Sequence, residues 1–289
     1  MKDSIAVIFS LLVLWGCHQE KENAKNSNIR TQTILNQLVS DYKLLPEGVV
    51  NRSTDSAVFA QYAMPTEKYG HGILGDKIEA EQLVVVVDGV FYEHNLPDEY
   101  VFEDISPRLY DVDGDGELEF VTIRTHVSRG GGIAIYKIVD EQLVEFAHLA
   151  EIGSRHRWLN IVAIADLDHD KIKELVWIET PHIGGILKVA EIEAGSLKVL
   201  AEEAQYSNHS IGERNLCLSV LTKQLDKKVF YVPNQSRDKI IGFTFENNEF
   251  QVFEEITQNV DFSKPLISQY GFSNQIEEGN YCSPQSIMP

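Results

Sequence analysis

The chain has 289 residues, which is enough for one large all-β domain or for two ordinary domains. Its 44 acidic side chains outnumber its 25 Lys and Arg side chains, so the formal net charge at pH 7 is −19. A protein that binds phosphate backbones carries the opposite sign, so this composition excludes nucleic acid as a partner. Few of the acidic residues form runs, and we expect low-complexity disorder only near the N-terminus.

Residues 1–16 have the pattern of a bacterial export signal. Lys2 provides a charged start, and the apolar run from Ile5 to Leu14 is too short to cross a bilayer as a helix. The ending Leu14-Trp-Gly-Cys17 resembles a lipobox, in which Cys17 becomes the lipidated first residue of the mature protein. Trp15 fits this motif poorly, so an ordinary signal peptide is the alternative. The leader predicts an exported protein whose lipid anchor holds it at a membrane, facing the periplasm or the cell surface.

The remaining segments follow in order along the chain. Residues 17–28 are polar and predict a flexible tether. Residues 29–48 predict one amphipathic helix ending at Pro46-Glu-Gly48, because apolar residues recur at helical spacing at Ile29, Ile34, Leu35, Leu38, Val39 and Tyr42. We expect residues 49–260 to form a repetitive β-domain and residues 261–289 to form a tail that packs on it. No later segment has the apolar length needed to cross a membrane.

Two cysteines, Cys217 and Cys282, remain beyond the leader. In an oxidising compartment such a pair often forms a disulfide, which here would close a loop of about 65 residues and add about 4 kcal/mol of stability. The alternative is two separate thiols, one in a strand and one in the tail.

The segment from Arg108 to Val121 has the pattern of a calcium-binding loop. Oxygen ligands fall at alternate positions, from the carboxylates of Asp111, Asp113, Asp115 and Glu119 and the carbonyl of Glu117. Gly114 and Gly116 allow the positive φ that a loop around an ion requires. The alternative is a polar surface turn, but a turn does not need carboxylates at alternate positions.

The loop differs from a helix-loop-helix calcium site. Such a site carries a bidentate Glu at its twelfth position, where this chain has Thr122. The exit from Glu119 to Ile123 is rich in β-branched and aromatic residues, which predicts a strand. We therefore expect the loop to join two strands.

The chain repeats itself with a period of about 54 residues, which is typical of repeat architectures. The segment beginning at Asp111 is echoed at Asp166, and the glycine-rich segment at Ser128 is echoed at His182 and more faintly at Arg237. Hairpins are predicted at the end of each unit, over residues 138–144, 192–198 and 245–250, and in a divergent first unit at Asp88-Gly89. The common plan is strand, loop, strand, turn, strand, hairpin, strand.

A four-stranded repeat of this period predicts an all-β fold, a β-propeller of four blades. A single twisted sheet cannot bury both faces alone and stacks on its neighbours. A fifth blade assembled from the two chain ends is left open. The competing fold is a pair of packed β-sandwiches, which the equal spacing disfavours.

Over roughly residues 57–256 the blades resemble FG-GAP or VCBS repeats, those of integrin-alpha-like propellers, in a bacterial exported lipoprotein. Blades of this family carry a D-x-D-G-D-G-x-x-D/E calcium loop between their first and second strands, and Asp111 to Glu119 has that motif. The resemblance implies a propeller fold and bound calcium. It implies no reaction.

The second copy of the loop is expected to bind calcium more weakly. It offers carboxylates and one carbonyl at the equivalent positions Asp166, Asp168, Asp170, Ile172 and Glu174. His169 and Lys171 replace the two glycines, at a cost on the order of 1 kcal/mol for each residue held at positive φ. Lys171 also brings a positive charge. In the next unit the ligand positions fall on Ser219, Leu221, Lys223 and Lys227, so no site is expected there.

The ion is expected to be structural. Extracytoplasmic calcium sites have dissociation constants of about 0.1 to 1 mM, and a tenfold excess over that adds only about 1.4 kcal/mol per site. The loop carries no neighbouring histidine or nucleophile.

Strands of a blade alternate in direction, so other loops gather opposite the calcium loops. Candidate ligand-binding residues in those loops are His71, His126, Arg129, Arg155, Trp158, His182, Asn208 and His209. Such donors favour an anionic or hydroxyl-rich ligand, such as a sugar acid or a phosphate group. The alternative is that Trp158 packs between blades while the histidines cap backbone carbonyls. No nucleophile, base and orienting group can be assembled from local sequence, so no catalytic residue is assigned.

These patterns predict a lipid-anchored, calcium-stabilised propeller that binds an envelope glycan, peptide or protein. One alternative is a periplasmic hydrolase or lyase that uses the His- and Arg-rich loops. The other is a purely structural module of the envelope.

Overall fold

The computed structural model describes residues 29–46, 49–54, 57–257 and 260–269. The predicted leader, Cys17, the tether and Cys282 lie outside these ranges. The described chain divides into an N-terminal unit that ends at Lys43 and a second unit that begins at Leu44. None of the helices in these ranges combines the length and the apolar character needed to span a bilayer.

The N-terminal unit contains a helix over residues 29–41, so the predicted end at residue 48 is wrong. From Leu44 the backbone is extended and forms a bridge with Ala63. Pro46 disfavours the helical region only for Leu45. The helix ends four residues before that position, so the proline does not account for its end.

The second unit consists of β-strands that pair antiparallel, apart from one parallel pairing between β9 and β13. The first sheet contains β1 (Asn51–Arg52), β2 (Val58–Thr66), β3 (Glu79–Val87) and β4 (Val90–Asn95). The second contains β5 (Tyr100–Phe102), β6 (Arg108–Tyr110), β7 (Glu119–His126), β8 (Gly130–Val139) and β9 (Gln142–His148). The third contains β10 (Leu159–Ala165), β11 (Glu174–Glu179), β12 (Ile186–Glu193) and β13 (Ser196–Ala204). The fourth contains β14 (Val220–Gln224), β15 (Lys227–Pro233), β16 (Ile240–Glu246) and β17 (Glu249–Ile256), and the short helix η1 (Leu266–Ser268) follows.

Consecutive strands pair within each sheet, except that β5 and β6 share one edge of β7. Among the described residues, single pairings at Ala80–Phe102 and Ser196–His148 link the first three sheets, while the fourth is separate. A register shift recurs in the pairing of the last two strands of the last three sheets, at Ile135/Tyr136, Val189/Ala190 and Gly242/Phe243. The even spacing of these shifts along the chain confirms the predicted period for the last three sheets.

Two-residue turns close the predicted hairpins. Both central residues have positive φ at Asp88-Gly89, Asp140-Glu141, Ala194-Gly195 and Asn247-Asn248. Turns of this type match the right-handed twist of the strands that they join. The four predicted hairpins are thereby confirmed.

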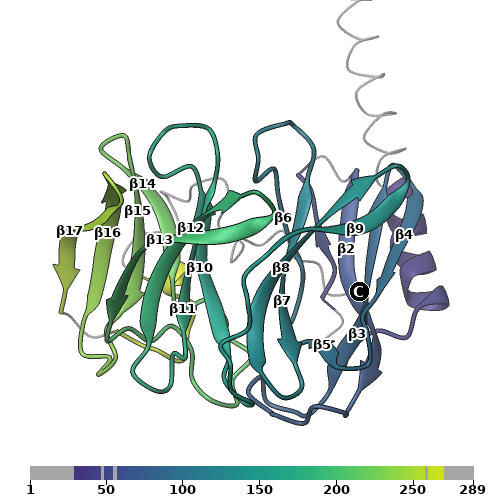
Figure 1. The fold of residues 1–289 in the computed structure, drawn as a ribbon, viewed down its shortest axis with the longest axis horizontal. Coiled ribbons are helices and arrows are strands. Elements are labelled where there is room, and N and C mark those ends of the chain that lie inside the picture. The colour runs from purple at the N-terminus through teal and green to yellow at the C-terminus, as the bar shows by residue number, and fades with distance from the viewer. Residues whose placement is uncertain (1–28, 47–48, 55–56, 258–259, 270–289) are drawn as a thin grey trace, which may run out of the picture. The chain divides into compact units, whose positions relative to one another are not determined.

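Both faces of β11, in the third sheet, are buried. On β11, Leu175 and Trp177 belong to one core together with residues of β7, while Val176 and Ile178 belong to another together with Phe230 of β15. Alternate residues of a strand point to opposite faces, so this strand lies between two neighbouring sheets. The sheets follow one another in chain order within the second unit (Figure 1).

Because the strands alternate, the loops collect at two ends of the sheets. The acidic end comprises the β6–β7 loop, residues 111–118, and the β10–β11 loop, residues 166–173. The histidine end comprises the loops over residues 67–78, 127–129, 149–158, 180–185, 205–219 and 234–239. Bonds between distant loops occur within each end, such as Lys173 N to Val112 O at 3.1 Å and Gly212 N to Ile73 O at 2.9 Å.

Candidate functional site

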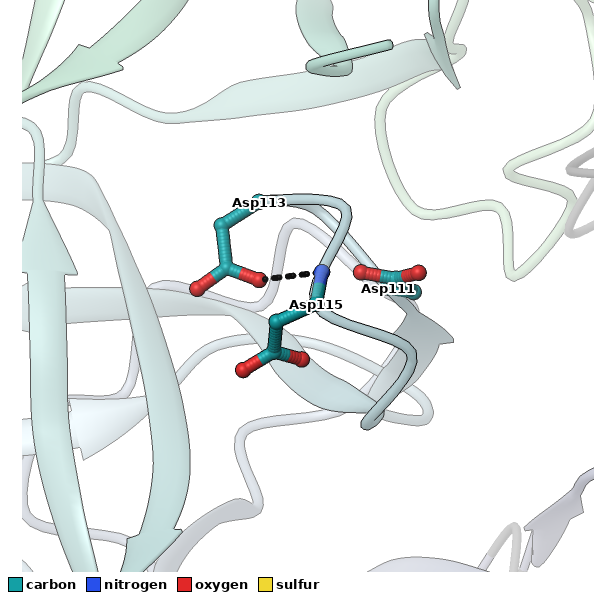
Figure 2. A group of neighbouring side chains, drawn as sticks. All are labelled: Asp111, Asp113 and Asp115. Atoms are coloured by element: carbon teal, nitrogen blue, oxygen red, sulfur yellow. Dashed lines mark hydrogen bonds between the residues drawn. The ribbon is translucent and has the colours of Figure 1, made fainter.

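The β6–β7 loop is organised by its own carboxylates. Asp111 accepts hydrogen bonds from the amides of Gly114 at 2.8 Å and Gly116 at 3.1 Å. Asp113 accepts one from the amide of Asp115 at 3.2 Å (Figure 2). Oxygens of these three aspartates lie within 4.8 Å of one another. The loop therefore concentrates oxygen donors around one position.

The β10–β11 loop repeats part of this hydrogen bonding. The amide of Asp170 donates to Asp168 at 3.2 Å, and the amide of Ile172 donates to Asp170 at 2.7 Å. His169 and Lys171 have φ of 72° and 83°, where Gly114 and Gly116 have 76° and 91°. The expectation that two non-glycine residues adopt positive φ here is confirmed.

A buried glutamate closes each loop at the start of the following strand. Glu119 Oε2 accepts from the Val112 amide at 2.8 Å, and Glu174 Oε2 accepts from the Leu167 amide at 2.5 Å. Burial raises the pKa of both carboxyl groups to about 7, against these hydrogen bonds, which lower it. Each glutamate is held in place but is costly to ionise without a cation.

The first loop has an internal cation that the sequence analysis missed. Lys137 Nζ on β8 lies 3.1 Å from Asp113 Oδ2 and 3.3 Å from Glu119 Oε1, and it also contacts Asp115. These carboxylates raise the pKa of Lys137 although burial opposes the rise. This contact was hard to predict from the sequence, because Lys137 lies on another strand and outside the calcium-loop motif.

The second loop has buried carboxylate oxygens without hydrogen-bond partners in the described chain. They are Glu174 Oε1 and Asp166 Oδ1. Oxygens of Asp166, Asp168 and Glu174 lie within 4.8 Å of one another. Unpaired buried acceptors of this kind fit a cation with a preference for oxygen ligands, such as calcium.

A lysine of the following sheet bonds to the backbone of each acidic loop. Lys173 Nζ donates to Asp111 O at 2.5 Å, and Lys228 Nζ donates to Asp166 O at 2.7 Å. The separation along the chain between donor and acceptor is the same in both pairs, so this contact follows the repeat. The fourth sheet has no acidic loop at the equivalent position, yet it supplies this lysine.

At the histidine end, Glu103 holds His71. The Glu103 side chain is 0% exposed; its Oε1 lies 2.5 Å from His71 Nδ1, and its Oε2 accepts from Thr125 Oγ1 at 2.7 Å. Burial raises the pKa of Glu103, and the bonds from His71 and Thr125 oppose that rise. Glu103 was missed because it follows a short strand far along the chain from its partner, with no local motif.

An exposed group adjoins this pair. The rings of His71 and His156 stack at 4.8 Å with 7° between their planes, and Tyr69 lies edge-on to both. Arg155 Nε lies 3.2 Å from His156 Nε2. The His71 side chain is 14% exposed, and Arg155 and His156 are exposed. These residues bring donors from two distant loops to one surface.

Behind this group, His182 and His209 pack against Trp158. His182 Nε2 lies 3.0 Å from His209 Nδ1, and His209 Nε2 lies 2.7 Å from Glu213 O. Burial lowers the pKa of both imidazoles to about 4. They are neutral near pH 7 and hydrogen-bond to each other, with His209 buried and His182 half-buried.

Four of the predicted ligand-binding residues are buried in this structure. Trp158, Asn208, His209 and His126 are at most 8% exposed. Trp158 Nε1 donates to Glu103 O at 2.9 Å, as packing between sheets requires, and His126 Nδ1 caps the Ser128 amide at 3.0 Å. Large side chains that follow strands fill the space between sheets, so they are unavailable to a ligand.

Arg129 is exposed but already has partners within the protein. Its guanidinium bonds to Glu151 at 3.2 Å and to the Tyr100 hydroxyl at 2.9 Å. Its charge is therefore already paired within the protein. Besides the exposed Arg129, the predicted residues that remain at the surface are Arg155 and the half-buried His71 and His182.

The described residues include one cysteine of the predicted disulfide, Cys217, but not the other, Cys282. Cys217 is disulfide-bonded, and its partner cysteine lies outside the described ranges. The carbonyl of Cys217 also accepts a bond from the Leu266 amide at 2.8 Å, and Leu266 is buried in the core of the fourth sheet.

No family model matches the chain, and no curated protein matches it significantly. The structure is similar to the periplasmic gluconolactonase of Pseudomonas aeruginosa, with 14% identity and a TM-score of 0.41 over 72% of this chain and 53% of that one. It is also similar to a protein of Lactobacillus plantarum, with 12% identity and a TM-score of 0.42 over 73% of this chain and 55% of that one. A rhamnogalacturonan lyase of Bacillus licheniformis has 12% identity and a TM-score of 0.36 over 74% of this chain and 53% of its own. The chain spans about half the length of these proteins. Similarity this weak carries no argument about activity.

Proposed function

We propose that the four sheets are blades of a calcium-stabilised β-propeller of the FG-GAP or VCBS type. Three observations support the proposal: the register shift that recurs with the repeat, the burial of both faces of β11, and acidic loops at the same place in consecutive units. Asp111, Asp113, Asp115 and Glu119 would hold one ion, and Asp166, Asp168, Asp170 and Glu174 the other. Bound calcium would offset carboxylate repulsion and tie each loop to the strand that follows it.

The function that we propose is capture of an anionic or hydroxyl-rich envelope ligand at the histidine end. The observation that carries it is the exposed group of Arg155 and His156 stacked on His71, in a chain whose net charge is −19. Charged and neutral N–H donors on one surface suit the carboxylate and hydroxyl groups of an acidic sugar. The leader and Cys17 support a lipid anchor, which would present this end in the periplasm or at the cell surface.

A second candidate function, as a hydrolase or lyase, is favoured by the Glu103–His71 pair. A buried carboxylate that engages Nδ1 of an imidazole leaves Nε2 to act as a general base. Arg155 would bind the substrate carboxylate. Nε2 of His71 would then take a proton from a carbon next to that carboxylate, or from an attacking water.

Binding is tested with uronic-acid oligosaccharides and inorganic phosphate as probes, by calorimetry on the purified protein. We expect the Arg155→Ala and His156→Ala double variant to lose about tenfold in affinity, since about 1.4 kcal/mol corresponds to that factor. Arg129→Ala is the matched control, because it removes an arginine at the same end whose charge is already paired. Equal losses in both variants would contradict the assignment.

Glu103→Gln separates capture from catalysis. The amide keeps the size of the side chain but removes the charge that orients and stabilises the imidazole. A binding protein retains capture of the same probes, whereas a hydrolase or lyase retains capture and loses release of shortened or unsaturated products. Absence of turnover by the unmodified protein on every captured probe would count against the second candidate.

A further inference from the structure

The two acidic loops differ in the cation that their own chain supplies. Lys137 Nζ lies 3.1 Å from Asp113 and 3.3 Å from Glu119, contacts Asp115, and belongs to a side chain that is only 13% exposed. The ammonium thus lies among three of the four carboxylates expected to bind calcium. Two cations compete for the same oxygens.

The second loop has no equivalent ammonium among the described residues. Phe120 on β7 pairs with Tyr136, and Leu175 on β11 pairs with Ala190, so Lys137 corresponds by register to Glu191. Of the two lysines within the second loop, Lys171 is exposed, and Lys173 donates from its Nζ to Asp111 O of the first loop. Water and salt screen an exposed charge, so it opposes an incoming cation much less than a half-enclosed one does.

Besides the clustering of its carboxylates, the second loop has a buried carboxylate oxygen without a partner, which indicates a bound cation. Glu174 is 0% exposed, its Oε1 has no hydrogen-bond partner among the described residues, and one of its carboxylate oxygens lies within 4.8 Å of oxygens of Asp166 and Asp168. Glu119 Oε1 of the first loop also lacks a hydrogen bond, but Lys137 Nζ lies 3.3 Å from it. Ionising the buried Glu174 beside two other carboxylates is costly, and a divalent cation removes that cost.

The strained residues of the second loop do not weaken the site. His169 and Lys171 have positive φ in a loop that its own amide-to-carboxylate hydrogen bonds hold. Their conformational cost of about 1 kcal/mol each is therefore present both with and without the ion. It lowers the stability of the fold and cancels from the binding equilibrium.

We infer that calcium binds the second loop more tightly than the first, and that Lys137 is the residue that weakens the first. The inference rests on the proposed calcium binding and reverses the ranking expected from the glycine content. Calcium can enter the first loop only by displacing the ammonium and breaking its ion pairs. At the second loop it meets carboxylates that no internal cation of the described chain neutralises.

Calorimetric titration of the full chain with calcium at pH 7 tests the ranking. We expect two binding steps, with Glu174→Gln removing the tighter one. Lys137→Met should strengthen the weaker step by about tenfold, equivalent to about 1.4 kcal/mol, and leave the tighter step unchanged. Lys188→Met is the matched control, because this β12 lysine is 17% exposed and paired with Glu179 away from both loops.

The outcomes separate this inference from the proposed function. Loss of the weaker step in Glu174→Gln, or no effect of Lys137→Met on either step, overturns the inference while calcium binding stands. No binding to the unmodified protein overturns the proposed calcium sites themselves. If Glu174→Gln does not fold, Asp115→Asn in the exposed part of the first loop tests the ranking instead. This variant should lower the calcium affinity of the weaker binding step, and loss of the tighter binding step would overturn the ranking.

Discussion

At the scale of single residues, the His182–His209 pair shows how the fold sets a protonation state. A carbonyl can only accept, so His209 carries its proton on Nε2 toward Glu213 O and accepts from His182 with Nδ1. Burial is the main cause that lowers both pKa values to about 4, and Arg237 nearby acts in the same direction. Because both ring nitrogens of His209 are engaged, His209 cannot gain a proton without losing the bond from His182.

This pair should make the protein less stable in mild acid. The unfolded chain binds protons to these histidines below about pH 6.5, while the folded chain does so only near pH 4, so stability falls as pH decreases through that window. From pH 7 to pH 5 we expect His209 to contribute a loss of about 2 kcal/mol, and the more accessible His182 less.

Urea denaturation at the two pH values measures this loss. His209→Gln retains a donor for the Glu213 carbonyl and should lose much of the pH dependence. His148→Gln, which removes an exposed imidazole on β9, is the control. An unchanged slope in His209→Gln would contradict the assignment.

At the scale of elements, the β11–β12 turn depends on close backbone approach at a glycine. The amide of Tyr206, on the chain leaving β13, donates to Gly185 O at 3.0 Å. A Cβ at Gly185 would overlap the Tyr206 carbonyl oxygen, whereas one at Gly184 meets nothing within 4 Å. Gly184 instead has a φ of +74°, which side chains rarely adopt.

Alanine at these adjacent glycines should therefore have unequal effects. We expect Gly185→Ala to reduce the free energy of unfolding by about 3 kcal/mol, because the backbone must move. Gly184→Ala should cost only about 1 kcal/mol, for its conformation alone. Urea denaturation at pH 7 compares the two, and equal losses would show that the close approach is absent.

At the scale of the whole molecule, the acidic end links sheets through repeated contacts. Lys173 joins the third sheet to the loop of the second, and Lys228 joins the fourth sheet to the loop of the third. Each loop also carries several carboxylates that repel one another without a cation. Calcium at the loops would therefore stabilise contacts between sheets as well as the loops themselves.

Calcium should raise the melting temperature. At ten times the dissociation constant, two sites add about 2.8 kcal/mol, which corresponds to several degrees for a chain of this size. Scanning calorimetry in chelator and in several millimolar calcium measures the shift. Magnesium should produce a smaller one, because it demands tighter octahedral geometry than these loops offer. Identical melting in chelator and calcium would count against both sites.

Local features of this protein were predictable from the sequence. The two-residue turns, the acidic loops and the strand that follows each loop depend on residues a few positions apart, such as Asp111 with Gly114 or Asp166 with His169. The backbone conformation of such segments is decided by short-range hydrogen bonds and by which residues tolerate positive φ. Repetition of these signals also revealed the spacing of the sheets.

The sequence by itself thus determined the sheets, their period and which loops carry carboxylates, because these follow from alternation and turn chemistry. Only the tertiary structure decided that Glu103 holds His71, that Lys137 reaches the first acidic loop, and that Trp158, Asn208 and His209 are buried. Those outcomes depend on side chains brought together from different strands. Packing between sheets, which no local pattern encodes, sets which polar groups meet and which remain open to solvent.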